Sequence, residues 1–390
     1  MVKAFQIARL PVLHFGPGQI TSLPMILSRY GSRILIITGK SSFIASPSAA
    51  GILDQLKKDG FTLFTEQIPG EPTPEMIDAI CDIYRGKEIH AVTGIGGGST
   101  LDAGKAVSAM LTQNQSVMNF LEEVGTQMHN GDKIPYIAVP TTAGTGSEAT
   151  KNAVLSRPGP QGFKKSLRHE NFVPDHAIID PQLSLSCPPE ITAATGMDAF
   201  TQLLESYTST QANPFTDALA FQGLQGIKSS LKQAFHSGND LKARTNMAFS
   251  AYASGITLAN AGLGVVHGFA SSMGAMFDIP HGILCGTLMA HVNEFNMGNL
   301  LTMGRENPAY YKYINTARLF IENFNMNEPD LLKAFMAYLH ELSQELGLTG
   351  LSRYRFGETR IEEILNNTSL KNNPVQLSRK ELKQIIDKVI

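Results

Sequence analysis

The chain has 390 residues, of which 43% are apolar and 17% charged, a composition that supports large buried cores in one or two globular domains. Its formal net charge of −2 leaves no excess of Lys and Arg to neutralise a phosphate backbone, so we expect no nucleic-acid partner. No run of about 18 apolar residues occurs and the N-terminus lacks a signal-peptide pattern, so we expect a cytoplasmic protein without a membrane span. The cysteines lack CxxC spacing and are interpreted as buried or incidental thiols: Cys81, Cys187 and Cys285.

Five short and almost continuously apolar runs predict buried parallel strands in the first half of the chain. They cover residues 33–39, 61–64, 90–94, 136–140 and 177–180. A helix is predicted at 49–60, because this segment ends at Gly60 as a C-terminal cap requires. Parallel strands buried on both faces require helices on both sides of the sheet, so we predict an α/β domain over residues 1–186.

The pattern changes after Pro188 and Pro189, which resemble the first turn of a helix. From there, apolar residues recur every three or four positions, the period of helices packed on one face. The asparagine-rich stretch at 366–380 is predicted to be a loop before a final amphipathic helix. We therefore predict an all-helical second domain over residues 187–390.

A glycine-rich turn follows the strand predicted at 90–94. Gly96, Gly97 and Gly98 lead into Ser99, which suits a helix N-terminus, and Asp102 follows within the first turn. Glycines let backbone N–H groups approach a ligand, and the positive end of a helix dipole favours a phosphate there. The turn departs from the dinucleotide fingerprint, so a tight turn without a ligand is equally compatible with it.

A second turn, after the strand predicted at 136–140, concentrates hydroxyl groups in Thr141, Thr142 and Ser147. Ligands of open α/β sheets bind at the carboxyl ends of the strands, where both turns lie. The alternative is that these hydroxyls only cap the local backbone, as Ser and Thr commonly do.

Candidate metal ligands occur in the second half. Asp198 and Gln202 are four residues apart in a predicted helix and project from one face. His267 and His281, fourteen residues apart, each precede a glycine. A carboxylate with imidazoles suits iron or zinc at a site open to substrate. Core or surface histidines without a metal are the alternative.

Taken together, these motifs resemble the iron-containing alcohol dehydrogenase family, which groups with glycerol dehydrogenases and dehydroquinate synthases. The resemblance spans essentially the whole chain and rests on GGGS at 96–99 with Asp102, PTTAGTGSE at 140–148, AATGMDA at 193–199, VHG at 266–268 and PHG at 280–282. It implies a dehydroquinate synthase-like architecture: an α/β dinucleotide-binding domain, a helical domain, and a metal in the cleft between them.

The resemblance also implies roles for individual residues. Asp198, His267 and His281 would be the catalytic metal site, with Gln202 as the fourth ligand. The pyrophosphate and its surroundings would contact Gly97, Gly98, Ser99 and Asp102. The ribose and nicotinamide would contact Thr141, Thr142 and Lys164. The cofactors would be NAD or NADP and a divalent metal, Fe²⁺ before Zn²⁺.

Two departures from the family concern the metal side of the cleft. Many members carry histidine where this chain has Gln202, whose neutral oxygen should bind iron(II) more weakly than imidazole. Many also carry histidine at the position of Ser271. If that histidine relays protons, this chain needs another route to solvent.

A third departure concerns the cofactor. Many members end the strand predicted at 33–39 with an aspartate, which binds the adenosine ribose and repels a 2′-phosphate. Here Gly39 is followed by Lys40 and by serines at 41–42. A small residue beside a cation and hydroxyls can accommodate NADP. A plain turn at Gly39, with Lys40 in water, is the alternative.

The resemblance thus implies a metal-dependent, NAD(P)-linked oxidoreductase that interconverts a small alcohol and its aldehyde or ketone, in a homodimer or larger homo-oligomer. One alternative is a non-redox lyase like dehydroquinate synthase, which would need several Lys and Arg for a phosphorylated substrate. The segments around Asp198 and His267 contain none. The other alternative is a nucleotide-binding protein that has lost metal and catalysis.

Overall fold

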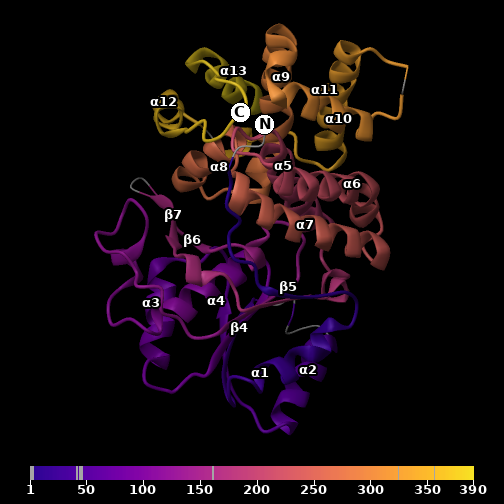
Figure 1. Ribbon diagram of the computed structural model, residues 1–390. Coiled ribbons are helices and arrows are strands. Elements are labelled where there is room, and N and C mark those ends of the chain that lie inside the picture. The colour runs from indigo at the N-terminus through magenta and orange to yellow at the C-terminus, as the bar shows by residue number, and fades with distance from the viewer. Residues whose placement is uncertain (1–3, 41–42, 44–46, 160–161, 324, 355) are drawn as a thin grey trace.

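A computed structural model describes residues 4–40, 43, 47–159, 162–323, 325–354 and 356–390. Its first half is built on a six-stranded, wholly parallel sheet with the strand order β1-β8-β5-β4-β2-β3. The strands are β1 (Val12–Phe15), β2 (Arg33–Gly39), β3 (Thr62–Ile68), β4 (Ala91–Gly96), β5 (Tyr136–Pro140) and β8 (His176–Ile179). In Figure 1 this half lies below the helical half. All five predicted strands are present.

Helices cover both faces of the sheet, as its buried central strands require. They are α1 (Leu23–Leu27), α2 (Pro47–Lys58), α3 (Pro74–Tyr84) and α4 (Gly98–Met110). Ile26 and Leu56 of α1 and α2 belong to one apolar cluster. Ile77 and Leu101 of α3 and α4 belong to a separate one. The sheet therefore separates two cores.

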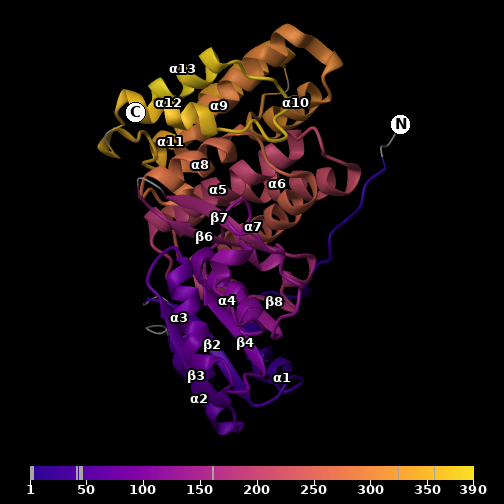
Figure 2. The same ribbon diagram turned by 90° about the vertical axis from the view of Figure 1, so that its left-hand side faces the viewer.

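Three strands escaped the sequence prediction. β1 lies at the edge of the sheet, and its Val12 is 56% exposed, so it lacks a continuous buried pattern. β6 (Asn152–Arg157) and β7 (Phe163–Arg168) form an antiparallel hairpin. Its many polar residues leave no continuous apolar run from which a strand could be predicted. Figure 2 shows this hairpin between the main sheet and the helices.

The second half is helical, and no strand follows β8 in the part of the chain that the structure describes. Its helices are α5 (Pro189–Thr208), α6 (Pro214–His236), α7 (Leu241–Ala261), α8 (Val265–Met276), α9 (His281–Met303), α10 (Pro308–Phe320), α11 (Glu328–Glu345), α12 (Glu358–Asn367) and α13 (Arg379–Val389). The predicted loop and the final amphipathic helix are both found. The proposed domain boundary at 186 falls between β8 and α5, and it stays a prediction.

Among the described residues, no single helix has both the length and the apolar composition needed to cross a membrane. One sharply bent pair, α7 with α8, meets these two criteria when its helices are taken together.

The strand order sets the position of the glycine turn. The chain passes from β2 outward to β3, returns through α3 to β4 on the other side of β2, and continues to β5. The carboxyl ends of β2 and β4 therefore flank a topological switch point, where ligands of open α/β sheets bind. Gly96 ends β4 there, and Thr38 of β2 pairs with the neighbouring Ile95.

The sheet half and the helical half meet closely at two glycines. Gly146, which follows β5 and has a φ of +62°, packs against Gly255 in the middle of α7. A Cβ placed on Gly255 would come within 2.3 Å of the Gly146 carbonyl oxygen. Because neither Gly146 nor Gly255 has a side chain, α7 can approach the turn after β5 this closely.

This contact predicts opposite effects for two helical glycines. Gly255→Ala should lower the free energy of unfolding by about 1–3 kcal/mol, because its methyl group collides with backbone. Gly298→Ala in α9 is the matched control, since nothing lies within 4 Å of its added Cβ. The control should raise stability by up to ~1 kcal/mol through helix propensity. Urea unfolding of both variants measures the difference, and equal stabilities would show that the glycine contact is unimportant.

Candidate active site in the interdomain cleft

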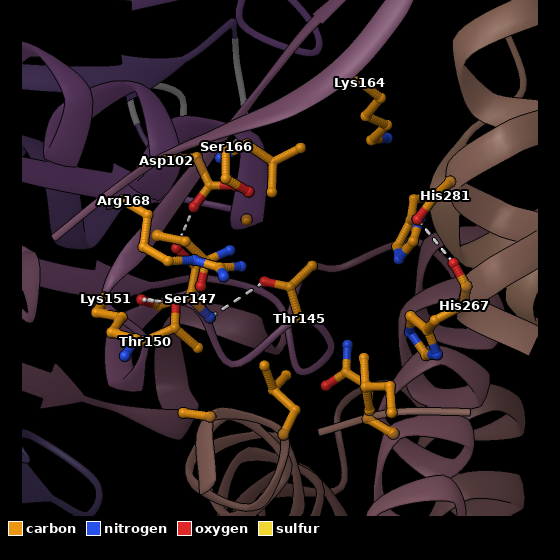
Figure 3. Close-up of a pocket in the computed structure, with 18 of the residues that line it drawn as sticks. Asp102, Thr145, Ser147, Thr150, Lys151, Lys164, Ser166, Arg168, His267 and His281 are labelled. Atoms are coloured by element: carbon orange, nitrogen blue, oxygen red, sulfur yellow. Dashed lines mark hydrogen bonds between the residues drawn. The ribbon is translucent and has the colours of Figure 1, made fainter. Parts of the chain in front are cut away.

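A cleft of about 570 Å³ lies between the sheet half and the helical half. Its walls include Ser99, Asp102 and Thr145 on one side and Gln202, His267 and His281 on the other. Figure 3 shows Asp102 and Ser147 facing the two histidines across this space, with Thr145 between them. The motifs found in the two halves of the sequence therefore border one cavity.

Three helices bring together a carboxylate, two imidazoles and a thiol. Asp198 comes from α5, His267 from α8, and His281 and Cys285 from the first turns of α9. The Nε2 atoms of His267 and His281 lie 3.4 and 3.7 Å from Asp198 Oδ1. Cys285 Sγ lies 3.6 Å from both nitrogens, and the four ligand atoms are all within 4.8 Å of one another.

The chemistry of this cluster suits a divalent cation. Asp198 is 1% exposed, and its Oδ1 accepts no hydrogen bond. Burial works against ionisation of Asp198, but its interactions with His281, His267 and Cys285 outweigh burial and hold the carboxyl pKa below its ordinary value. A buried carboxylate oxygen without a donor is costly unless a cation neutralises it. Oxygen and nitrogen donors of this kind bind iron and zinc.

Glu205 orients one of the imidazoles. It lies on α5 below Asp198, and its Oε2 accepts a 2.7 Å hydrogen bond from His267 Nδ1. Its Oε1 accepts a second bond of 2.7 Å from the Val266 backbone N–H. A proton held on Nδ1 leaves the lone pair of Nε2 directed at the cluster, the usual way a carboxylate positions a ligating histidine.

Sequence reasoning missed Glu205 and Cys285. Glu205 follows Asp198 by seven positions and Gln202 by three, so the helical period alone places all three on one face. The sequence predicts Cys285 to be a buried or incidental thiol. Cys285 is buried, and its Sγ also joins the cluster, which the sequence analysis did not foresee. Burial raises the pKa of this thiol to about 12. Its four-residue spacing from His281 was the available signal.

Gln202 lines the cleft as expected, but its side chain already has a partner. Its Oε1 accepts a 2.7 Å hydrogen bond from Ser254 Oγ of α7. An amide oxygen has a second lone pair, so this bond does not prevent ligation. The role of Gln202 as a metal ligand stays a prediction.

The glycine turn forms the opposite wall. Gly97 is the N-cap of α4, and no side chain caps that helix end. A Cβ on Gly98 would lie 2.5 Å from Thr145 Oγ1, so glycine is needed where the two turns touch. Uncapped N–H groups at a helix N-terminus, bordered by Ser99 in the cleft, suit the pyrophosphate of a dinucleotide.

Asp102 borders the cleft while holding its wall together. Its oxygens accept hydrogen bonds from Ser147 Oγ at 2.5 Å and from the Val154 N–H at 3.1 Å. Lys105, one turn further along α4, donates to the carbonyl oxygens of Ser147 and Asn152, each at 2.8 Å. Burial raises the pKa of Asp102. These bonds fix the turn after β5 and the start of β6 along the wall of the cleft.

The other predicted cofactor residues are distributed unevenly. Lys164 lines the main cleft, where its Nζ is 2.6 Å from Glu71 Oε1. Thr141 and Thr142 line a smaller cavity beside it, near Asp180. Thr142 nevertheless lies next to the glycine turn, since a Cβ added to Gly97 would lie 3.4 Å from the Thr142 Oγ1 atom.

Gly39 ends β2 at the switch point, and Lys40 is exposed there. Neither residue lines the main cleft. The serines at 41–42 lie outside the described residues. Contact of Gly39 and Lys40 with a cofactor stays a prediction.

An α/β sheet with an uncapped glycine turn at its switch point, facing a buried carboxylate–imidazole cluster across one cleft, is the arrangement expected of a metal-dependent enzyme that uses a nucleotide cofactor. Comparison with known proteins identifies the class further. The family model "Iron-containing alcohol dehydrogenase" matches residues 11–181, and the model of the family's C-terminal part matches residues 192–390.

Individual relatives agree with these matches. The chain is 34% identical over 284 residues to long-chain-alcohol dehydrogenase 1 of Geobacillus thermodenitrificans, covering 72% of this chain and 71% of that one. It is 31% identical over 337 residues to 1,3-propanediol dehydrogenase of Klebsiella pneumoniae, covering 83% and 84%. The solved structure of sulfoacetaldehyde reductase from Bifidobacterium kashiwanohense with NAD⁺ matches with a TM-score of 0.84 and 26% identity, covering 99% and 98%.

The chain belongs to the iron-containing alcohol dehydrogenase family. It is an oxidoreductase that interconverts alcohols and aldehydes, and the family uses NAD(P) and iron. The resemblance found in the sequence motifs is thereby confirmed, as are the α/β and helical halves of the fold.

The contact between Glu205 and His267 predicts a loss of metal affinity in Glu205→Gln. The Val266 N–H and the His267 Nδ1–H each donate to one oxygen of Glu205. A glutamine has a single amide oxygen, so it can accept only one of these two bonds, and its amide N–H₂ would face the other donor. Loss of such an outer contact lowers metal affinity by about 10- to 100-fold. Titration with Fe²⁺ or Zn²⁺ measures the change.

Glu345→Gln is the control, because Glu345 pairs with Lys232 and His236 away from the cleft. This variant should bind metal like the wild type. Unchanged affinity in Glu205→Gln, with its thermal midpoint close to that of the control, would show that Glu205 does not position the ligand.

Proposed function

We propose that Asp198, His267 and His281 hold one divalent ion at which a small alcohol is oxidised by NAD(P), with the reverse reduction in the same cleft. One observation carries this proposal. Asp198 Oδ1 is buried and accepts no hydrogen bond, and the Nε2 atoms of His267 and His281 lie 3.4 and 3.7 Å from it. Gln202 and Cys285 are further candidates for the ligand shell. Residues 1–186 would bind mainly the cofactor, and residues 187–390 would supply the metal ligands.

The chain's own residues divide the work of catalysis. A bound divalent ion supplies Lewis acidity, which lowers the pKa of an alcohol and polarises a carbonyl. Glu205 keeps His267 in the tautomer that presents Nε2. The uncapped N-terminus of α4 would bind the pyrophosphate, and Lys164, held by Glu71, would flank the nicotinamide side. The protein thereby sets the distance and orientation of hydride transfer.

The fold bears on the lyase alternative, which needs several cations for a phosphorylated substrate. The segments around Asp198 and His267 carry no Lys or Arg, yet other segments bring four cations to the cleft: Lys151, Lys164, Arg168 and Lys371. Cleft charge therefore does not exclude a negatively charged substrate. The family matches favour the dehydrogenase, since they name alcohol dehydrogenases over both halves of the chain.

We also infer a cytoplasmic homo-oligomer, at least a dimer, in keeping with the sequence resemblance. Size-exclusion chromatography with light scattering measures its mass directly. A monomer at all concentrations would refute this part of the proposal.

The metal assignment predicts that His267→Ala loses both bound metal and alcohol oxidation, because the variant lacks one of two imidazoles around Asp198. His236→Ala is the matched control, since the His236 side chain is 56% exposed and pairs with Glu345 on the surface. Metal content and NAD(P)H production by the reconstituted proteins are measured together. Full activity of His267→Ala would refute the assignment. Absence of metal and activity in the wild type would favour the nucleotide-binding alternative.

The cofactor region predicts that NADP(H) is used at least as well as NAD(H), because Gly39 presents no carboxylate to repel a 2′-phosphate and Lys40 can pair with it. Gly39→Asp should shift the ratio of kcat/KM for the two cofactors toward NAD. Steady-state kinetics with both cofactors measure this ratio. Gly298→Asp, at an uncrowded glycine of α9 outside the cleft, controls for added charge. A wild type strongly selective for NAD would contradict the prediction.

A further inference from the structure

A lysine from the C-terminal loop reaches the metal side of the cleft. Lys371 lies between α12 and α13 and lines the cleft, with its Nζ 3.5 Å from Ser271 Oγ. Ser271 follows His267 by one turn of α8 and donates a 2.7 Å hydrogen bond to the His267 carbonyl oxygen. Lys371, Ser271 and His267 therefore line one stretch of the same cleft.

The loop that carries Lys371 is firmly attached to the helices beneath it. The Asn372 N–H donates to the Leu263 carbonyl oxygen, and the Asn372 carbonyl oxygen accepts from the Thr210 N–H, each at 3.0 Å. Asn373 is 3% exposed. Lys371 itself has a φ of +50°, a strained value for a residue with a side chain. Strain of this kind persists only where surrounding contacts enforce it, and it often marks functional positions.

Lys371 differs from the other cations of the cleft in having no carboxylate partner. Lys151 pairs with Glu170, Lys164 with Glu71 and Arg168 with Glu122. Lys371 forms no ion pair with any carboxylate in the described parts of the chain, and its ammonium has only the Ser271 hydroxyl.

The surroundings make this ammonium receptive to an anion. Lys371 is exposed to solvent inside the cleft that it lines. Partial desolvation lowers the pKa of Lys371 against the opposing effects of Glu205 and Cys285, and the charges of Arg168 and Lys165 lower it further. An ammonium without a carboxylate partner gains more from an incoming carboxylate than a lysine that is already paired.

We propose that Lys371 and Ser271 form an anion subsite, so that the substrate of this dehydrogenase is a short hydroxy acid, or the matching oxo acid, with its carboxylate on Lys371. The inference rests on the proposed function, because the reacting carbon must lie beside His267 and His281. Both ends of such a molecule would lie in the one cleft that Lys371, His267 and His281 line. Hydride passes from the alcohol carbon to NAD(P)⁺ and the hydroxyl proton is released, while the carboxylate is unchanged.

The test compares an acid with a neutral alcohol of the same length in the reconstituted holoenzyme. The readout is kcat/KM for 4-hydroxybutyrate divided by kcat/KM for 1-butanol. Lys371→Met should lower this ratio by about 10- to 100-fold, as expected for loss of a charge-assisted contact. Lys383→Met is the matched control, since Lys383 pairs with Asp387 on α13 and should leave the ratio unchanged.

A second variant separates charge from folding. Lys371→Gly removes the ammonium and also relieves the positive φ, so it should be at least as stable as the wild type and should show the same fall in the ratio. Lys371→Arg should keep part of the preference because it keeps the charge.

The outcomes distinguish this proposal from the proposed function. No turnover of either compound by the metal-loaded wild type would count against the dehydrogenase site itself. Turnover of 1-butanol with an unchanged ratio in Lys371→Gly would overturn the anion subsite alone. An equal fall for both compounds would mean that Lys371 moves protons. A raised KM for NAD(P) with an unchanged ratio would mean that it binds the cofactor, and either result overturns the proposal.

Discussion

The unsatisfied charge of Asp198 is the constraint around which the helical half is organised. Its Oδ1 is buried without a hydrogen-bond donor, and such an oxygen is stable only beside a cation. Three helices, α5, α8 and α9, meet at this point, and each contributes at least one atom that can ligate a metal. Glu205 extends the arrangement outward by fixing the tautomer of His267. Metal binding should therefore stabilise the helical packing as well as create the reactive site.

The sheet half supplies the complementary requirement, an edge whose geometry suits the binding of an anion. The strand order creates a switch point between β2 and β4, and the glycine turn opens α4 there without a side-chain cap. Asp102 ties this turn to the residues after β5. Gly146 and Gly255 then hold the two halves at close range. Because hydride transfer needs reacting carbons about 3–3.5 Å apart, this packing is part of the chemistry.

Much of this architecture could be predicted from the sequence, for definable reasons. Buried parallel strands are continuously apolar, so all five predicted runs were found, whereas the polar β6–β7 hairpin left no such signal. Asp198, His267 and His281 could be recognised from motifs. Glu205 was accessible through helical spacing but was overlooked. Cys285 is buried as predicted, but its place in the cluster was missed because a lone cysteine carries no motif. The position of Lys371 depends on loop geometry, which no local pattern encodes.

The central claim is that one metal ion bound by the helical half faces a nicotinamide held by the sheet half. A crystal structure with Fe²⁺ or Zn²⁺ and NAD(P), using anomalous scattering to locate the metal, tests it most directly. The account predicts a metal peak about 2.0–2.3 Å from Asp198 Oδ1 and from the Nε2 atoms of His267 and His281, with the nicotinamide ring facing it across the cleft. A metal bound elsewhere, or a nicotinamide carbon more than about 10 Å from it, would contradict the account, because a hydride cannot cross such a gap.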